Sequence, residues 1–377
     1  MRFLSIIFND STGGEGRIFR DISEHYRTEK LVLFSSTRNE ISDAVIYPVR
    51  FLLNALIRLD EDLGVFTSSI ISSLFLRRSY LNGFDIVFFN SSSIAFPPFK
   101  NMITILYTPP RALTDRYPDS LELIKARNCL LVPLFRIGSK ILNVAYKASV
   151  CDRNNLICIS ANVRERLKKY YGADCLTVPL FINVVDHRNS SFSNFFLYVS
   201  RITPGKRQHL AIEAFKLFCD SKGNFRFVIA GTTDSTEHSR RYLEELRNIS
   251  LGYPIEFVLS PSDDTVRDLY SNCYLTLFTA KNEDFGLAPL ESMASGKPVI
   301  ALNEGGPKET IINGTTGFLV DDIAGMAERM VYLADNIDEN ISMGKRGREH
   351  VEKNFSPESF YTKIDALIQS VLRKDKK

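Results

Sequence analysis

Lys281-Asn-Glu-Asp-Phe-Gly-Leu-Ala-Pro-Leu-Glu291 is the stretch that decides the fold. The apolar run before it ends with residues 276–279, which predict a buried strand. Pro289 suits the first turn of a helix, where its missing N–H costs nothing, and Gly296 suits the C-terminal cap of that helix. The stretch therefore predicts a strand, a loop and a helix in succession.

The same alternation continues as far as Val320. Residues 299–302 are a second buried run, and Pro307 opens another helix that Asn313-Gly314 ends. Residues 317–320 form a third buried run. Strand, helix, strand, helix, strand is typical of a parallel sheet, so the predicted fold class is α/β.

Two glutamates flank the predicted start of the first helix. Glu283 lies in the loop at the carboxyl end of a strand, where open α/β sheets bind ligands, and Glu291 lies within the helix. Between them, the N–H groups near residues 285–288 would point out of the helix N-terminus, an arrangement that most often binds phosphate. The stretch thus offers a phosphate site between two acceptors for hydroxyl groups. A nucleotide-diphosphate sugar carries these groups in that order.

This pattern resembles the signature of the retaining family-4 glycosyltransferases, also called glycosyl transferases group 1. The resemblance is carried by Glu283-x7-Glu291, by Gly305-Gly306-Pro-Lys-Glu309 and by Asn313-Gly-Thr-Thr-Gly-Phe-Leu-Val320. It implies a GT-B fold, in which two Rossmann-like domains face a cleft. It also implies that Glu283 binds hydroxyls of the donor sugar and that Glu291 binds the ribose. It adds three donor-binding residues within the signature: Phe285, Gly286 and Leu287. The alternative is an ordinary strand–helix–strand unit with two surface glutamates.

Two basic residues follow the predicted strand 195–199. Arg201 lies at the end of this strand, and Lys206 lies near the start of the next predicted helix. A lysine at a helix N-terminus is disfavoured by the helix dipole unless an anion shares the site, so the two cations predict neutralisation of a diphosphate. The resemblance implies the same role, while two exposed cations are the alternative. It implies three further donor contacts: Gly14 beside the phosphates, and Leu259 and Ser260 near the base.

Tyr107-Thr-Pro-Pro-Arg111, with Asp115 soon after it, follows another predicted strand at 102–106. The segment is similar to the His-Thr-Pro-x-Arg plus Asp pattern of a mannosyltransferase-like subgroup. This similarity implies contacts of Tyr107, Arg111 and Asp115 with the sugar or the acceptor. Tyr107 stands where the subgroup has histidine, which leaves the mannose assignment open. A surface ion pair between Arg111 and Asp115 is the alternative interpretation.

A polar segment at 183–194 separates two halves of the chain and predicts the domain boundary. We expect an acceptor-binding Rossmann-like domain over residues 1–190 and a nucleotide-sugar-binding one over residues 191–355. Residues 356–377 are expected to form a helix that packs back on the first domain. In that first domain, residues 47–82 are predicted to be helical and apolar.

Composition excludes several classes of function. The net charge of +3 over 377 residues gives no case for nucleic-acid binding. None of the six cysteines forms a C-x-x-C pair, so neither a zinc site nor a redox motif is expected, and a reducing cytoplasm is the simplest location. No Asp-x-Asp lies beside the basic pair, so we expect no metal and no cofactor besides the donor co-substrate. The N-terminal apolar stretch is too short for a signal peptide, and no membrane-spanning run is expected.

Two predicted helices carry basic residues on one face. In the first, three cations share helical spacing: Arg136, Lys140 and Lys147. Apolar residues form an adjacent stripe: Ile137, Ile141 and Val144. Such a helix either lies on an anionic membrane surface or presents a solvated face, and both interpretations stay open. In the second helix, between Ser160 and Gly172, the charges including Arg166 are expected to be solvated.

Taken together, the residues and the resemblance predict a metal-independent, retaining glycosyltransferase. It would move a sugar from a nucleotide-diphosphate sugar to a saccharide or a lipid-linked saccharide, in the cytoplasm or at the inner face of the membrane. No residue is an evident covalent nucleophile, which agrees with the same-face attack that the family is thought to use. The alternatives are a nucleotide-sugar epimerase of the same fold and an inactive nucleotide-binding subunit.

Overall fold

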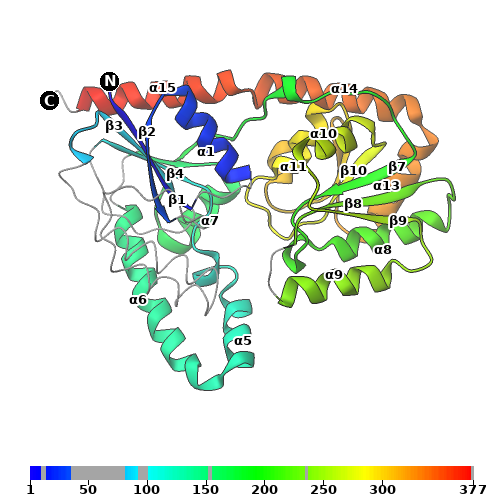
Figure 1. The fold of residues 1–377 in the computed structure, drawn as a ribbon, viewed down its shortest axis with the longest axis horizontal. Helices are drawn as coiled ribbons and strands as arrows, with labels where there is room; N and C mark the ends of the chain where they lie inside the picture. The colour runs from blue at the N-terminus through cyan, green and yellow to red at the C-terminus, as the bar shows by residue number, and fades with distance from the viewer. Residues whose placement is uncertain (10–13, 35–80, 92–100, 152–154, 234–236, 375–377) are drawn as a thin grey trace. The chain divides into compact units, whose positions relative to one another are not determined.

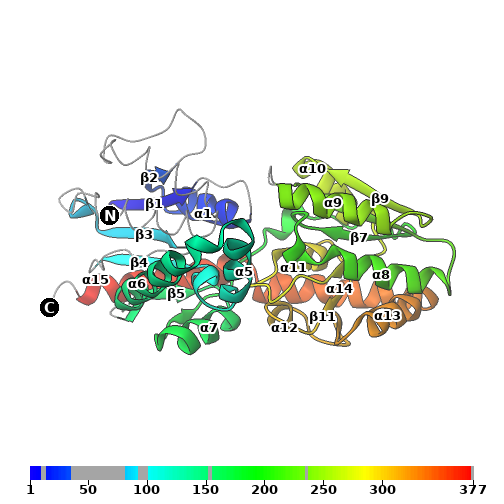
Figure 2. The ribbon, with the colours of Figure 1, turned by 90° about the horizontal axis from the view of Figure 1, so that it is seen from below.

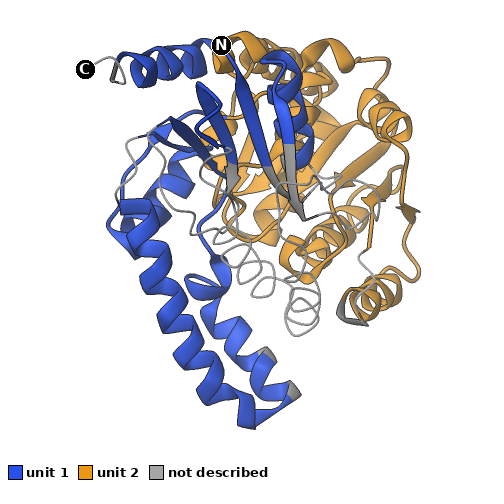
Figure 3. Ribbon diagram, turned by 60° about the vertical axis from the view of Figure 1, so that its left-hand side comes forward, with its two compact units in different colours: residues 1–179, 362–377 blue, residues 180–361 orange. Residues whose placement is uncertain are grey.

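The computed structural model describes residues 1–9, 14–34, 81–91, 101–151, 155–233 and 237–374. The chain divides into two compact units (Figure 3). Unit 1 comprises Met1–Pro179 and Thr362–Lys377, and unit 2 comprises Leu180–Tyr361. Most of the predicted helical stretch 47–82 lies outside the described residues.

Unit 1 contains a six-stranded sheet in the order β2-β1-β3-β4-β5-β6, and every neighbouring pair is parallel. The strands are β1 Phe3–Asn9, β2 Glu29–Phe34, β3 Ile86–Ser91, β4 Met102–Leu106, β5 Leu156–Cys158 and β6 Leu176–Thr177. The helices include α1 Gly14–His25, α5 Tyr117–Arg127, α6 Val132–Cys151 and α7 Ala161–Tyr171. All five residues of β4 are buried, as expected for a central parallel strand covered on both faces.

Helices α5 and α6 form a hairpin that projects away from the sheet of unit 1 (Figure 1). A 3-10 turn, Cys129–Leu131, joins the two helices. Seen from below, the hairpin crosses the near side of this unit (Figure 2). The sheet and the hairpin are therefore distinct parts of unit 1.

Unit 2 contains a second parallel sheet of six strands in the order β12-β11-β10-β7-β8-β9. Its strands are β7 Phe195–Val199, β8 Arg226–Gly231, β9 Ile255–Leu259, β10 Leu275–Phe278, β11 Val299–Leu302 and β12 Gly317–Val320. Its helices are α8 Gln208–Cys219, α9 Glu237–Ile249, α10 Asp263–Asn272, α11 Leu287–Ala294, α12 Pro307–Thr310, α13 Ile323–Asp335 and α14 Ile337–Asn354. Helix α15, Pro357–Lys374, begins in unit 2 and ends in unit 1. The predicted α/β class with two parallel sheets is confirmed.

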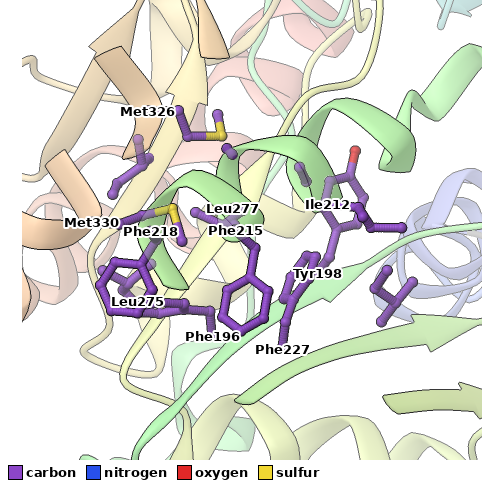
Figure 4. Packing of buried hydrophobic residues seen from close by; sticks show 14 of the residues in the cluster. Phe196, Tyr198, Ile212, Phe215, Phe218, Phe227, Leu275, Leu277, Met326 and Met330 are labelled. Atoms are coloured by element: carbon purple, nitrogen blue, oxygen red, sulfur yellow. The ribbon is translucent and has the colours of Figure 1, made fainter. Parts of the chain in front are cut away.

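The core of unit 2 has two faces because side chains alternate along each strand. Phe196 and Tyr198 of β7 point to one face, where they pack with Phe215 and Phe218 of α8 (Figure 4). Helices α9 and α13 cover the same face with Leu246 and with Met326 and Met330. Phe195 and Leu197 point to the other face and pack against Tyr270 of α10. Because helices cover both faces of the sheet, the loops that could bind a ligand lie at the carboxyl ends of its strands.

The division between the units differs from the predicted boundary at residue 190. Contacts divide the chain after Pro179, because the polar segment that follows is bound to unit 2. The N–H of Ser190 donates to the carbonyl of Ser271 at 3.0 Å, and the Lys297 ammonium donates to Asn189 at 2.8 Å and to the carbonyl of Ser191. A change in composition marked a linker, but hydrogen bonds make that linker part of the second unit.

Candidate active site

The carboxyl ends of β7 and β10 bring two predicted site residues into contact. These strands are neighbours in the sheet, and the N–H of Lys281 after β10 donates to the carbonyl of Gly205 after β7 at 3.0 Å. The Lys206 ammonium donates to Oε2 of Glu283 at 2.5 Å. Both side chains are about a quarter exposed or less. The cation predicted for the diphosphate and the carboxylate predicted for the sugar thus form one half-buried ion pair.

A buried tyrosine holds the turn that carries Lys206. This turn is the 3-10 segment Pro204–Lys206, so Lys206 precedes α8 rather than lying within it. The Tyr198 hydroxyl donates to the carbonyl of Lys206 at 2.6 Å and accepts from the N–H and the hydroxyl of Thr279, each at 3.2 Å. Burial raises the pKa of Tyr198, so the hydroxyl keeps its proton and remains a donor. One side chain therefore joins the end of β10 to the Lys206 turn.

Arg207, to which the sequence analysis gave no role, completes this joint. It adopts a left-handed conformation with φ of 52°, its Nε donates to the carbonyl of Thr279 at 2.7 Å, and its guanidinium pairs with Glu304. Desolvation lowers the pKa of Arg207, but the guanidinium remains charged. The sequence signal was the second basic residue in Lys206-Arg207. Its connection to Glu304, almost a hundred residues later, required the structure.

Two glycines allow the Glu283 loop to lie against the loop after β11. The N–H of Gly306 donates to the carbonyl of Glu283 at 2.7 Å. A Cβ on Gly305 would lie 2.6 Å from both N and O of Glu283, and a Cβ on Gly306 would lie 2.1 Å from the carbonyl oxygen of Phe285. Any larger residue would push these loops apart. The Gly-Gly pair of the resemblance thus has a steric cause.

Helix α11 begins one residue before the predicted Ala288. Gly286, with φ of 89°, precedes it and provides no side-chain hydrogen bond to the first turn, which leaves the N-terminus suited to an anion. The ring of Phe285 is buried and packs edge-on against Phe355, with 5.9 Å between the centroids, so only its backbone can face a ligand. Leu287, the first residue of the helix, is half-buried.

Glu291 lies on the second turn of α11. Its side chain is half-buried, and the Tyr270 hydroxyl donates to its Oε2 at 3.2 Å. Tyr270 is itself almost fully buried. Tyr270 of α10 therefore positions the Glu291 carboxylate on α11, whereas the Lys206–Glu283 pair lies before the start of α11.

Three other predicted donor residues of unit 2 lie at the carboxyl ends of β7 and β9. Arg201 is exposed directly after β7, where its carbonyl accepts from the amide of the buried Gln208 at 2.8 Å. Leu259 and Ser260 end β9 and are exposed, and Ser260 has φ of 49°. Strands β7 and β8 separate β9 from β10, so these residues share the sheet edge with the ion pair without adjoining it.

The predicted site residues of unit 1 follow β1 and β4. Gly14 is the first residue of α1, and residues 10–13 before it lie outside the described ones. Tyr107 is buried directly after β4. Asp115 Oδ2 accepts from Nε and Nη2 of Arg111 at 3.2 and 2.8 Å. The ion pair is therefore present, but its side chains are only 19% and 18% exposed, so it is not the surface pair of the alternative interpretation.

Arg166 belongs to the same cluster, and its predicted solvated position is wrong. It is 5% exposed, and its Nη1 donates to the hydroxyl of Thr108 at 3.0 Å. Burial by itself would raise the pKa of Asp115, but the charge and hydrogen bonds of Arg111 and the charge of Arg166 together lower it. Arg166 lies on the same side of α7 as the buried Val163, one turn earlier, so the helical period was the signal that could have placed it inside.

Two cysteines and one apolar helix depart from expectation. Cys158, the last residue of β5, forms a disulfide with Cys175, which precedes β6, whereas a reducing environment was expected from the sequence. Across the ranges given above, one helical segment, Cys129–Cys151, is long and apolar enough to cross a membrane by length and composition, and 17% of it is buried. Within those same ranges, no group of three or more His, Cys, Asp or Glu residues could hold a metal ion.

Known structures and sequences agree with this architecture. A sucrose-phosphate synthase from Thermosynechococcus elongatus aligns with 99% of this chain and all of its own at a TM-score of 0.72 and 16% identity. The two parallel six-stranded sheets are those of a GT-B glycosyltransferase. The family model Glycosyl transferases group 1 matches residues 185–350, which contain the Lys206–Glu283 pair and α11.

Two relatives are similar over most of the chain. The mouse protein named alpha-1,3/1,6-mannosyltransferase ALG2 is 33% identical over 324 residues, which cover 78% of this chain and 75% of the relative. The Dictyostelium discoideum protein of the same name is 26% identical over 328 residues and 76% of each chain. The chain belongs to the glycosyl transferases group 1 family, and it is a glycosyltransferase.

Proposed function

We propose that this glycosyltransferase takes a sugar from a nucleotide-diphosphate donor and transfers it with retention and without a metal ion. The observation that carries the proposal is the Lys206–Glu283 ion pair at the sheet edge just before the N-terminus of α11. A cation, a set of helical N–H groups and a carboxylate match a diphosphate followed by sugar hydroxyls. Glu291, on the second turn of the helix, is then available to the ribose.

The ion pair suggests how a donor diphosphate would bind: it would compete with Glu283 for Lys206. Lys206 and Glu283 lie 2.5 Å apart and neutralise each other. A diphosphate is a stronger competitor for Lys206 than one carboxylate because it carries more charge. Its arrival would release Glu283 to accept hydrogen bonds from the sugar. As the bond to the sugar breaks, charge grows on the leaving diphosphate, and Lys206 with Arg201 would stabilise it in place of a metal.

Mannose is our proposal for the transferred sugar. It rests on the names of the two relatives and on the segment Thr108-Pro-Pro-Arg111 with Asp115. The acceptor is proposed to be a saccharide or a lipid-linked saccharide. Tyr107, Arg111 and Asp115 are proposed contacts of the sugar or the acceptor. Gly14, Leu259 and Ser260 are proposed contacts of the donor.

A cytoplasmic location is also a proposal. Thiol titration of Cys158 and Cys175 in protein isolated under alkylating conditions tests it, because a stable disulfide argues for an oxidising compartment.

Thermal shift with a panel of GDP-, UDP- and ADP-sugars tests the donor class. A ligand at about 100 times its dissociation constant stabilises the folded state by about 2.7 kcal/mol. The stabilising donor is then incubated with saccharide and lipid-linked acceptors, and the anomeric configuration of the product is read by NMR. A retained glycoside supports the proposal. An epimerised free sugar nucleotide, or no turnover and no donor hydrolysis with any donor, would contradict it.

A further inference from the structure

The α5–α6 hairpin of unit 1 carries an apolar stripe that faces solvent. Five side chains at alternating spacings of four and three residues form it, with exposed fractions from 59% to 81%: Leu130, Leu134, Ile137, Ile141 and Val144. The opposite face of α6 is already packed, with Phe135, Tyr146 and Val150 buried. The helix therefore has two apolar faces, of which the core of unit 1 uses one. We call the exposed one the α6 stripe.

Positive charge flanks the α6 stripe on one side. Arg136, Lys140 and Lys147 are exposed, and at about 100° per residue they lie about a quarter-turn from the centre of the stripe. Between Leu123 and Cys151 the sequence has no acidic residue and five cations: these three, Lys125 and Arg127. Lys125 pairs with Glu122 at 3.7 Å, so the positive charge beside the α6 stripe comes from Arg136, Lys140 and Lys147.

We propose that the α6 stripe is a membrane-docking surface that lies in the interface of an anionic lipid layer. An apolar stripe flanked by cations matches the acyl chains and the anionic headgroups of such a layer. A second copy of this chain fits less well, because pairing two α6 stripes would bring the same cations together without acidic partners. The helix lies along the surface rather than across it, because its other face is buried in unit 1 and its cations would enter the hydrocarbon.

This inference does not depend on the donor chemistry. It gives the hairpin a role in holding unit 1 at a lipid surface, which would place a lipid-linked acceptor and the enzyme on the same layer. Docking needs neither donor nor turnover, so failure of docking and failure of the transfer reaction are measured separately.

The chain contains no tryptophan, so one substitution gives a depth probe without background. Ile141→Trp places the probe on the α6 stripe, and Leu251→Trp places a matched control at a side chain of unit 2 that is 76% exposed. Each variant is mixed with phosphatidylcholine vesicles, with and without phosphatidylglycerol. We expect a blue shift of Ile141→Trp emission, and quenching by brominated lipid, with anionic vesicles and no change for Leu251→Trp.

The cations are tested by vesicle flotation of the triple variant Arg136→Gln, Lys140→Gln and Lys147→Gln. Each cation near an anionic surface contributes about five-fold to partitioning, so the variant should bind roughly 100-fold more weakly. Its thermal unfolding should match wild type, because the three side chains are exposed. Unchanged Ile141→Trp emission with anionic lipid would overturn the proposal. Sedimentation showing a dimer that Ile141→Glu dissociates, without lipid binding, would instead assign the α6 stripe to a second copy.

Discussion

The Tyr198 hydroxyl makes a specific prediction because it connects the core to the candidate site. Tyr198→Phe keeps the ring and its stacking on Phe278 but removes the atom that donates to the carbonyl of Lys206 and accepts twice from Thr279. These groups are buried, and a buried polar group without a partner costs about 1–3 kcal/mol. The Thr279 hydroxyl still reaches the carbonyls of Lys206 at 3.3 Å and Arg207 at 2.7 Å, so we expect the free energy of unfolding to fall by about 1–2 kcal/mol. For a unit of this size, the melting temperature falls by roughly 2–8 °C.

The same substitution should slow transfer. Without the hydroxyl, the turn that carries Lys206 loses one of its anchors to the end of β10, and a misplacement of about 1 Å can cost on the order of 100-fold in rate. We therefore expect kcat/KM to fall by about 10- to 100-fold.

Tyr274→Phe is the matched control for this prediction. Tyr274 is also buried in unit 2, and its hydroxyl also donates to a backbone carbonyl, that of Leu333 at 2.7 Å, but it lies in the core away from the Lys206 turn. It should lose about 1 kcal/mol of stability and keep wild-type kinetics. Scanning calorimetry and steady-state transfer assays measure both variants. Equal loss of activity in the two, or full activity in Tyr198→Phe despite lower stability, would refute the positioning role.

Three further predictions concern charge. Arg201→Ala and Lys206→Ala should each lower the transfer rate on the order of 10²–10³, because each leaves diphosphate charge uncompensated, and wild-type kinetics in either would remove that residue from the site. Transfer should persist in excess EDTA, and recovery of activity only on adding magnesium or manganese would show that side chains do not balance the charge. Burial lowers the pKa of Lys297 to about 8, so the unfolded chain binds more protons between about pH 8 and 10.5 and the free energy of unfolding should rise with pH across that window. Denaturant titrations of wild type and Lys297→Met measure this effect. Over that pH window, wild type should gain up to about 3 kcal/mol of unfolding free energy relative to the variant. A difference between the two proteins that does not change with pH would contradict the prediction.

The second half of the fold could be predicted because its sequence is locally consistent. Each predicted strand of this half is a short apolar run ended by turn residues. The four predictions at 195–199, 276–279, 299–302 and 317–320 match β7, β10, β11 and β12 within one residue at either end. The cap of α7 was equally local, since Ser160 accepts from the N–H of Val163 and Gly172 has φ of 69°.

The contacts between loops that are distant in the sequence could not be predicted. The motif named Lys206 and Glu283, but their ion pair and the hydrogen bonds of Tyr198 and Arg207 join segments some 80 residues apart through the pairing of β7 with β10. Periodicity within one segment does not specify such contacts. Arg166 shows a different error. Its charge led to the prediction of a solvent-exposed side chain, whereas its position on the buried face of α7 places it near Asp115.

Calorimetry with a bare nucleoside diphosphate tests most directly the central claim, which is how the donor lies along α11. Replacing Glu283 with Gln removes the partner of Lys206 but leaves the ammonium for the phosphates, so affinity should stay the same or rise while turnover falls. Replacing Glu291 with Gln removes a carboxylate proposed to bind the ribose, so affinity for the same ligand should fall by about 10- to 100-fold. If Glu283→Gln loses the ligand and Glu291→Gln keeps it, the donor lies in the opposite direction and the account is wrong.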